Sequence, residues 1–291
     1  MNQQAHTMKP DPFFILGHPR SGTSLLRSIL NSHDKIVVPP ECGFVQWLHA
    51  RYRDFDKIQI DGFVSDLSLS RKIEGWNLDF EALRHFLIRK TPRSYSELCS
   101  LVYQFYGESL GKDLLLWGDK NNYYIHHLGE IVSIYPGAQF IHIIRNPKDV
   151  VRSHLDVIDL PSSTYKPNFS GSIREMTENW IDNNNKVSVF LEKGGFQKLE
   201  VHYEALISDA AKVTQEICDF LCISSEGVLG NFESKKYFDE PETTMEWKAK
   251  LTGSILPNNF NTYSERLTEN DAMIIDKLLS DRVLEFNYIE F

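Results

Sequence analysis

The stretch FFILGHPRSGTSLL, residues 13–26, contains an apolar run, a polar turn and then leucines that continue at helical spacing. The apolar run ends at Gly17, and the first leucine of the second half is Leu25. This order predicts a strand, a tight loop and an amphipathic helix. Because free backbone N–H groups gather at the start of a helix, the loop is a candidate binding site for an anion.

The loop has the glycine spacing of a nucleoside triphosphate-binding loop but lacks its lysine. Gly17 and Gly22 are separated by four residues, and Thr23 stands where that lysine would be. The lysine reaches the β- and γ-phosphates, so its absence argues against γ-phosphoryl transfer. The groups that remain suit a smaller anion such as a 5′-phosphosulfate. They are the side chains of Arg20, Ser21, Thr23 and Ser24.

A second anion site is predicted where another strand ends. Residues 139–144 are almost continuously apolar, which is typical of a parallel strand covered on both faces. Arg145 follows the strand, Asn146 and Pro147 begin a helix, and Ser153 lies on that helix. An arginine at this edge faces the ligand crevice of an open α/β sheet. A metal-binding nucleotide site would carry an aspartate there instead.

The remaining pattern predicts one α/β domain over residues 1–291, with residues 1–11 flexible. Repeated alternation of strands and helices indicates a central parallel sheet. Further strands are expected at 36–38, 113–117 and 199–203, and further helices near 125–135, 147–155, 173–193 and 270–285. A mostly helical region, 44–111, is expected on the acceptor side, and 156–171 is long enough for a lid.

Composition limits the class of protein. The 291 residues carry a formal net charge of −9, which argues against general nucleic-acid binding. The four cysteines form no CxxC pair, so free thiols in a reducing compartment are expected. The polar N-terminus and the absence of an apolar run of about 20 residues predict a cytoplasmic protein without a membrane span. A membrane anchor removed from the chain remains an alternative.

Two motifs together resemble the sulfotransferase superfamily that uses 3′-phosphoadenosine-5′-phosphosulfate (PAPS). Its phosphosulfate loop reads P-[RK]-S-G-T-[ST]-L-L, and residues 19–26 match every position. Its 3′-phosphate motif reads R-[DN]-P-x-[DE]-x-x-x-S, which residues 145–153 match. The arginine in the loop resembles the carbohydrate and tyrosylprotein branches more than the soluble small-molecule branch. The resemblance implies a P-loop-type sulfotransferase fold with the donor on Pro19, Arg20, Ser21, Gly22, Thr23, Ser24, Arg145 and Ser153.

The same resemblance suggests the catalytic groups. Glu41 stands where related enzymes carry a glutamate base, although a glutamate here is also suited to the start of the next helix. Lys120, in Trp117-Gly118-Asp119-Lys120, corresponds to a lysine beside the transferring group, or is an exposed turn residue. Arg20 is expected to neutralise charge on the leaving group. The small-molecule branch uses a histidine base, but His49, His126 and His127 match no such motif.

Two further contacts to the nucleotide are expected on weaker matches. Tyr203 would pack on the adenine, or else belongs to the core. Lys250, in Trp247-Lys248-Ala249-Lys250, would reach the 3′-phosphate in place of an absent R-K-G triplet, or else is a solvated charge.

The sequence therefore predicts a PAPS-dependent sulfotransferase that needs no metal and releases adenosine 3′,5′-bisphosphate (PAP). A carbohydrate or glycolipid hydroxyl is the favoured acceptor, followed by a tyrosine or a small alcohol. A P-loop kinase for a small metabolite and a non-catalytic nucleotide-binding protein are the alternatives. The sequence does not indicate the oligomeric state.

Overall fold

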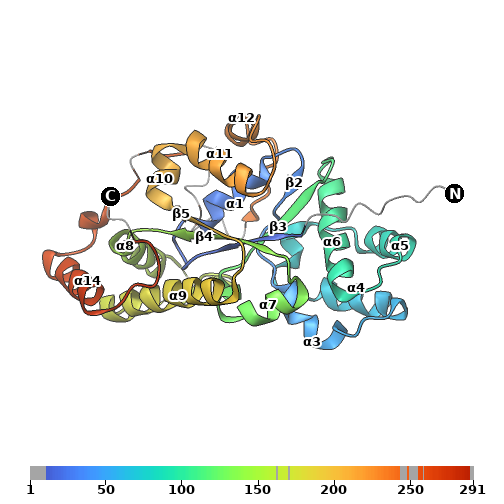
Figure 1. The fold of residues 1–291 in the computed structure, drawn as a ribbon, viewed down its shortest axis with the longest axis horizontal. Helices are drawn as coiled ribbons and strands as arrows, with labels where there is room; N and C mark the ends of the chain where they lie inside the picture. The colour runs from blue at the N-terminus through green and yellow to red at the C-terminus, as the bar shows by residue number, and fades with distance from the viewer. Residues whose placement is uncertain are drawn as a thin grey trace.

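The computed structural model describes residues 11–161, 163–169, 171–242, 248, 255–257 and 259–288. A five-stranded parallel sheet forms its centre, in the order β2-β3-β1-β4-β5 (Figure 1). Its strands are β1 (Phe13–Leu16), β2 (Ile36–Val37), β3 (Leu116–Lys120), β4 (Gln139–Ile144) and β5 (Lys198–His202). The expected α/β fold with a parallel sheet is thus confirmed, while residues 1–10 and Lys250 lie outside the described residues.

Helices cover both faces of the sheet, because successive strand side chains point to opposite faces. Phe13 and Ile15 of β1 face one layer, whereas Phe14 and Leu16 face the other. The first layer consists of α1 (Thr23–Asn31), α10 (Tyr203–Ser208), α11 (Ala210–Phe220) and α12 (Val228–Glu233), above the sheet in Figure 1.

The second layer contains α7 (Leu128–Ile134) and α9 (Ile173–Gly194), below the sheet in Figure 1, and a helical region at its right. The helical region comprises α2 (Phe44–Trp47), α3 (His49–Tyr52), α4 (Ile60–Ser68), α5 (Phe80–Lys90) and α6 (Tyr95–Ser109). It also contains the 3₁₀ helices η1 (Lys57–Gln59) and η2 (Ile73–Trp76). The expectation of a mostly helical region over 44–111 is confirmed.

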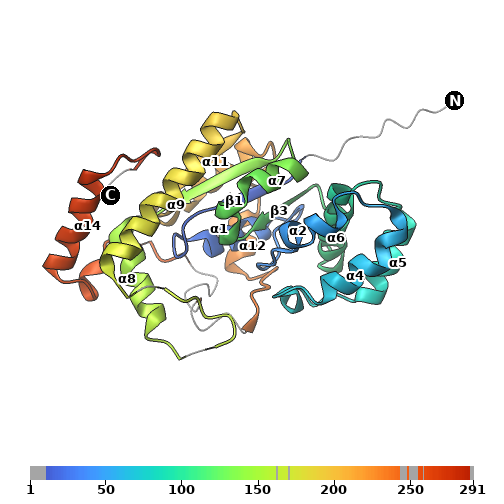
Figure 2. The ribbon, with the colours of Figure 1, turned by 90° about the horizontal axis from the view of Figure 1, so that it is seen from below.

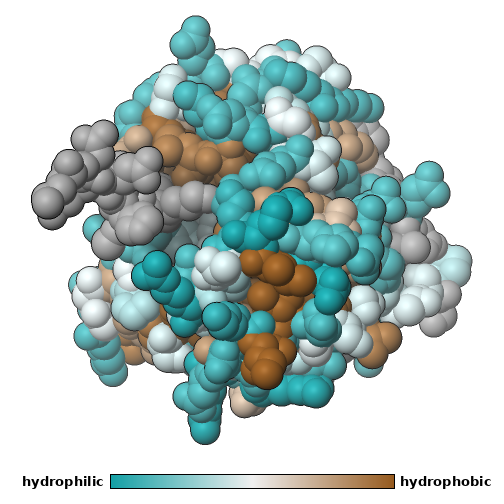
Figure 3. Space-filling view, turned by 90° about the vertical axis from the view of Figure 1, so that its right-hand side faces the viewer, coloured by the Kyte–Doolittle hydropathy of each residue, from teal (hydrophilic) through white to brown (hydrophobic). Residues whose placement is uncertain are grey.

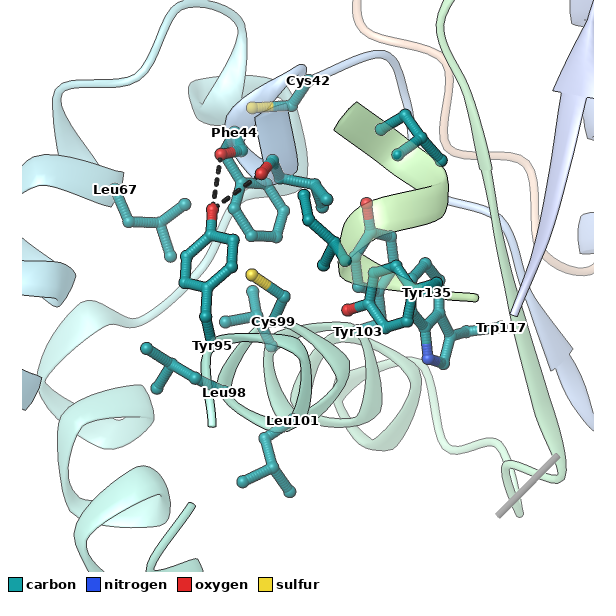
Figure 4. Close-up of a cluster of buried hydrophobic side chains, with 14 of the residues drawn as sticks. Cys42, Phe44, Leu67, Tyr95, Leu98, Cys99, Leu101, Tyr103, Trp117 and Tyr135 are labelled. Carbon is teal, nitrogen blue, oxygen red and sulfur yellow. Dashed lines mark hydrogen bonds between the residues drawn. The ribbon is translucent and has the colours of Figure 1, made fainter. Parts of the chain in front are cut away.

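Aromatic side chains join this helical region to the sheet. Tyr103 of α6 stacks on Trp117 of β3, with ring centroids 3.9 Å apart. Tyr95 donates its hydroxyl to the carbonyl oxygens of Phe44 and Val45, so α6 also fixes the start of α2 (Figure 4). The outer surface of this side is mostly hydrophilic with separate apolar patches (Figure 3).

Two more helices lie at the opposite end of the sheet, α8 (Pro147–Ile158) and α14 (Glu269–Asp281). Figure 2 shows the segment between α8 and α9 extending away from the helices. The 3₁₀ helices η3 (Asn122–His126) and η4 (Tyr263–Glu265) complete the description. None of the helices in the described residues combines the length and apolarity needed to cross a bilayer.

Several element boundaries differ from the sequence-based expectation. The third strand, expected at 113–117, lies at Leu116–Lys120, because Gly118 leaves room for the ring of Phe13 and pairing with β1 continues to Lys120. Tyr203 begins α10 rather than ending β5. The last helix ends at Asp281 and not near 285, since Arg282 is extended and the chain turns to pack Phe286 on Trp180.

We expect Gly118→Ala to lower the free energy of unfolding by about 2 kcal/mol, because a methyl group there would lie 2.3 Å from Cζ of Phe13. Gly129→Ala is the control, since no atom lies within 4 Å of the added carbon in α7. It should raise stability by up to about 1 kcal/mol. Urea unfolding measures both, and equal effects would show that Phe13 yields to the methyl group.

Candidate active site at the carboxyl edge of the sheet

The loop after β1 is built to expose the N-terminus of α1. Arg20 and Gly22 both have positive φ angles, 73° and 93°, and Gly22 is the N-cap residue of α1. No side chain caps the helix and no acidic residue lies in its first turn. The hydroxyl of Ser21 is buried and has no hydrogen-bond partner among the described residues. These free donors fit the phosphosulfate anion expected there.

Tyr203, the first residue of α10, and Arg145, which follows β4, pack on this loop. A side chain at Gly22 would place its Cβ 2.3 Å from the ring of Tyr203, so glycine is required by contact as well as by φ. The guanidinium of Arg145 lies over the ring of Tyr203, 4.2 Å from the ring centroid. Arg145 also donates from Nη1 to the carbonyl oxygen of Arg20, at 3.1 Å.

Two guanidinium groups and a hydroxyl meet at this end of the sheet. Arg20 donates from Nε to Oγ of Ser153, at 2.9 Å. Burial, and next the nearby charge of Arg145, lower the pKa of Arg20 to about 10. Nε of Arg145 is buried without a partner among the described residues. Two adjacent like charges, Arg145 buried and Arg20 half-buried, favour binding of an anion between them.

A segment from the C-terminal part of the chain completes this cluster. Asn259 donates from Nδ2 to the hydroxyl of Tyr203, at 2.8 Å, and its carbonyl oxygen accepts from Nη2 of Arg145, at 3.4 Å. The segment is fixed by Asp149, whose carboxylate accepts the backbone N–H groups of Asn261 at 2.7 Å and Thr262 at 2.9 Å. The motif acid therefore anchors a distant part of the chain.

Glu41 lies between two lysines at the other end of the site. Its carboxylate contacts Nζ of Lys120 through Oε1 and Nζ of Lys72 through Oε2, the latter at 2.7 Å. Lys120 also donates to Oγ of Ser24 in the loop, at 3.2 Å. Burial alone raises the pKa of Glu41, but the two ammonium groups outweigh it and hold the pKa well below its usual range. Glu41 is therefore anionic at neutral pH.

The pKa of Lys120 is lowered as well, but for Lys120 burial is the cause and the ion pair with Glu41 opposes it. Its side chain is 1% exposed, and this burial lowers its pKa to about 8 although Glu41 opposes the change. Lys120 is therefore not an exposed turn residue, which excludes that alternative. Its ammonium group joins the phosphate loop to the carboxylate, so the expected base and the expected donor site lie in contact through one side chain.

A cavity of about 810 Å³ connects these groups and is large enough for a nucleotide and part of an acceptor. Its walls include Arg20, Glu41, Lys120, Arg145 and Tyr203. Other lining residues were not singled out from the sequence, because all of them except Lys248 come from segments without motifs, and Lys248 lies in the segment quoted for Lys250. They are Trp47, Arg71, Lys72, Tyr123, Lys248, Asn259 and residues 165–169.

Comparison with known proteins decides the family. The model of the sulfotransferase family matches residues 12–226. The chain belongs to the sulfotransferase family.

The individual relatives share only part of their length or of their sequence with this chain. The nodulation protein NoeE of Sinorhizobium fredii is 33% identical over 48% of this chain, and the match spans only 30% of that protein. A Caenorhabditis briggsae protein named "Putative protein-tyrosine sulfotransferase" is 24% identical over 87% of this chain and 81% of its own length. The sulfotransferase domain of the Synechococcus PCC 7002 olefin synthase has a TM-score of 0.61 at 20% identity, covering 96% and 98% of the two chains. This last likeness shows the fold.

None of the three histidines considered as a base is among the described residues of the cavity wall. His49, His126 and His127 do not appear among the described residues that line the cavity, and His49 instead contacts Glu130 at 3.1 Å. The interpretation of Glu41 as base stays a prediction, as do the adenine contact of Tyr203 and the role of Arg20 at the leaving group. In this structure Arg20 contacts Ser153 rather than Glu41 or Lys120.

We expect Asp149→Asn to loosen the segment at 261–262, because a neutral amide replaces a carboxylate that accepts two backbone N–H groups. Hydrogen exchange of the Asn261 and Thr262 amides should become about tenfold faster, as loss of a charged acceptor costs about 1–2 kcal/mol. Asp219→Asn, on an exposed position of α11, is the control. Unchanged exchange would show that other contacts hold the segment.

Proposed function

We propose that this sulfotransferase moves the sulfuryl group of PAPS to an acceptor hydroxyl. The observation that carries the proposal is the arrangement of two anion-binding clusters with a carboxylate between basic groups in one cavity. Pro19, Gly22 and Thr23 line the cavity at the loop. The phosphosulfate would bind at residues 19–24 and the 3′-phosphate at Arg145 and Ser153, with Arg20 shared between them. Nothing in the proposal requires a metal.

In the proposed reaction, Glu41 accepts the proton of the acceptor hydroxyl as its oxygen attacks sulfur. The new oxygen–sulfur bond forms while the bond from sulfur to the phosphate oxygen of PAPS breaks. The electron pair of that bond stays on the phosphate, and PAP leaves. Lys120 is near enough to the loop, through Ser24, to stabilise the developing charge.

The rival functions are less well supported by the side chains. A kinase would need a group in place of the missing lysine, and Thr23 is too short to reach the terminal phosphates. A non-catalytic nucleotide-binding protein would not need a carboxylate beside the loop. Among acceptors, the arginine-type loop favours a carbohydrate or glycolipid hydroxyl, and the name of the Caenorhabditis relative keeps a tyrosine acceptor in second place.

Calorimetry with PAP, without metal, tests the donor site. We expect tight binding by the wild type and binding weaker by about 100-fold for Arg145→Ala, because truncation leaves a buried phosphate without its charged donors. Arg89→Ala, at an exposed position of α5, should bind like the wild type. A preference for magnesium–ATP, or indifference to Arg145, would contradict the proposal and favour the kinase.

Glu41→Gln tests the base. The substitution keeps the shape of the side chain but removes the proton acceptor, so transfer of a radiolabelled sulfuryl group should slow by about 10²–10⁴-fold. The affinity for PAP should change little. Transfer at the wild-type rate would place the base elsewhere, and loss of PAP binding would show instead that Glu41 is needed to hold the lysines.

A further inference from the structure

The cavity is strongly basic although the chain as a whole is acidic. Its described lining includes one carboxylate, Glu41, and a larger set of cations. These cations are Arg20, Arg71, Lys72, Lys120, Arg145, Lys166 and Lys248. Some are neutralised by the protein itself, since Lys72 and Lys120 contact Glu41 and Lys248 contacts Glu240 at 2.6 Å. The others are paired with no carboxylate of the described residues, so an anionic ligand could bind them.

Four cations of the cavity have no carboxylate within 4 Å among the described residues. Arg20 and Arg145 are adjacent, on the loop and after β4, where the proposed function places the donor. The donor's own phosphate and phosphosulfate groups account for them. Arg71 and Lys166 remain, and they belong to a different wall of the cavity, formed by the chain between α4 and η2 and by the segment between α8 and α9.

Arg71 and Lys166 are each held on this wall by backbone carbonyl groups, and Arg71 also by an aromatic ring. Arg71 donates to the carbonyl oxygen of Thr164, at 3.4 Å, and its guanidinium lies 5.3 Å from the ring centroid of Tyr165. Lys166 donates to the carbonyl oxygens of Ile158, at 2.9 Å, and Leu160. These contacts position the two cations without neutralising them, as carbonyl oxygens carry no net charge.

This wall adjoins the carboxylate proposed as base. Lys72, the residue after Arg71, binds Glu41, and its ammonium also lies 5.8 Å from the ring centroid of Tyr165. Trp47 and Tyr123 line the same cavity and are 36% and 43% exposed. Half-exposed aromatic rings of this kind are available to stack on a sugar or phenol ring. The cavity thus offers a ring contact, the proposed base and two cations that no carboxylate of the described residues neutralises.

We propose that the acceptor carries a carboxylate, which Arg71 and Lys166 bind while the reacting hydroxyl faces Glu41. This inference rests on the proposed function and specifies its substrate class. The anion has two chemical sources, an acidic sugar or a phenol with a carboxylate nearby. Both present the same charge to the two cations.

Two matched pairs of acceptors test the inference with radiolabelled PAPS. Methyl glucuronide is compared with methyl glucoside, and 4-hydroxyphenylacetate with 4-hydroxyphenethyl alcohol, so each pair differs in one negative charge. In at least one pair, the wild type should transfer the sulfuryl group to the acidic acceptor about tenfold faster than to its neutral partner at low acceptor concentration. A charge-assisted hydrogen bond is strong enough to produce a difference of this size. The pair that shows the difference identifies the source of the anion.

Variants locate the effect. Arg71→Ala and Lys166→Ala, combined, should reduce transfer to the acidic acceptor to the rate of its neutral partner and leave the neutral rate unchanged. Arg71→Lys should retain part of the preference, and Arg89→Ala all of it. PAP binding should be unaffected in every variant, which separates this inference from the donor site.

Two results would overturn the inference while the proposed function stands. One is transfer to the neutral acceptors that is as fast as, or faster than, transfer to the acidic ones. The other is no transfer to any of the four acceptors by an enzyme that still binds PAP and still hydrolyses PAPS in a reaction that depends on Glu41. A wild type that does not bind PAP would instead contradict the proposed function itself.

Discussion

The parallel pairing of β3, β1 and β4 is the constraint on which the whole site depends. Because the three strands run in one direction, their carboxyl ends meet at one edge, and each end carries a charged or anion-binding group. Lys120 ends β3, the glycine loop follows β1, and Arg145 follows β4. The register pairs Ile15 with Lys120 and Leu16 with His142, so the loop lies between the two cations. No flexible segment has to fold over to bring them together.

The residues that sequence reasoning selected meet in the fold where the motifs are local, and their binding of the donor stays a prediction. The loop, Arg145 and Ser153 lie within short motifs whose residues contact one another in the fold, and β4 was placed at its observed bounds because it is uninterrupted by polar residues. Reasoning of this kind could not place Lys72 or Asn259. Each reaches the site only through packing of a remote segment, α4 to η2 in one case and the chain held by Asp149 in the other.

The predicted bounds of β3 were wrong for a related reason. The apolar letters of residues 114–117 suggested a strand ending before Gly118, yet the sheet accepts three more residues because glycine makes room for Phe13. That shift has a functional consequence. Lys120 is a buried strand residue whose ammonium group is directed by the sheet rather than by a turn, and its depressed pKa follows from that burial.

Lys120 also explains how the two halves of the site can influence each other. It contacts Ser24 of the loop and Glu41, and both carboxylate oxygens of Glu41 are engaged by lysines. For the proposed role of Glu41 as base, an acceptor hydroxyl has to reach a lone pair that the two lysines leave open, and the carboxylate is a weaker base while both contacts persist. The arrival of a negatively charged donor at the loop would draw the ammonium of Lys120 toward it, by simple Coulomb attraction, and so release Oε1. Lys72 would meanwhile keep Glu41 anionic and oriented. The arrangement therefore favours a carboxylate at Glu41 that becomes a stronger proton acceptor after the donor has bound, because it then has one ammonium neighbour fewer.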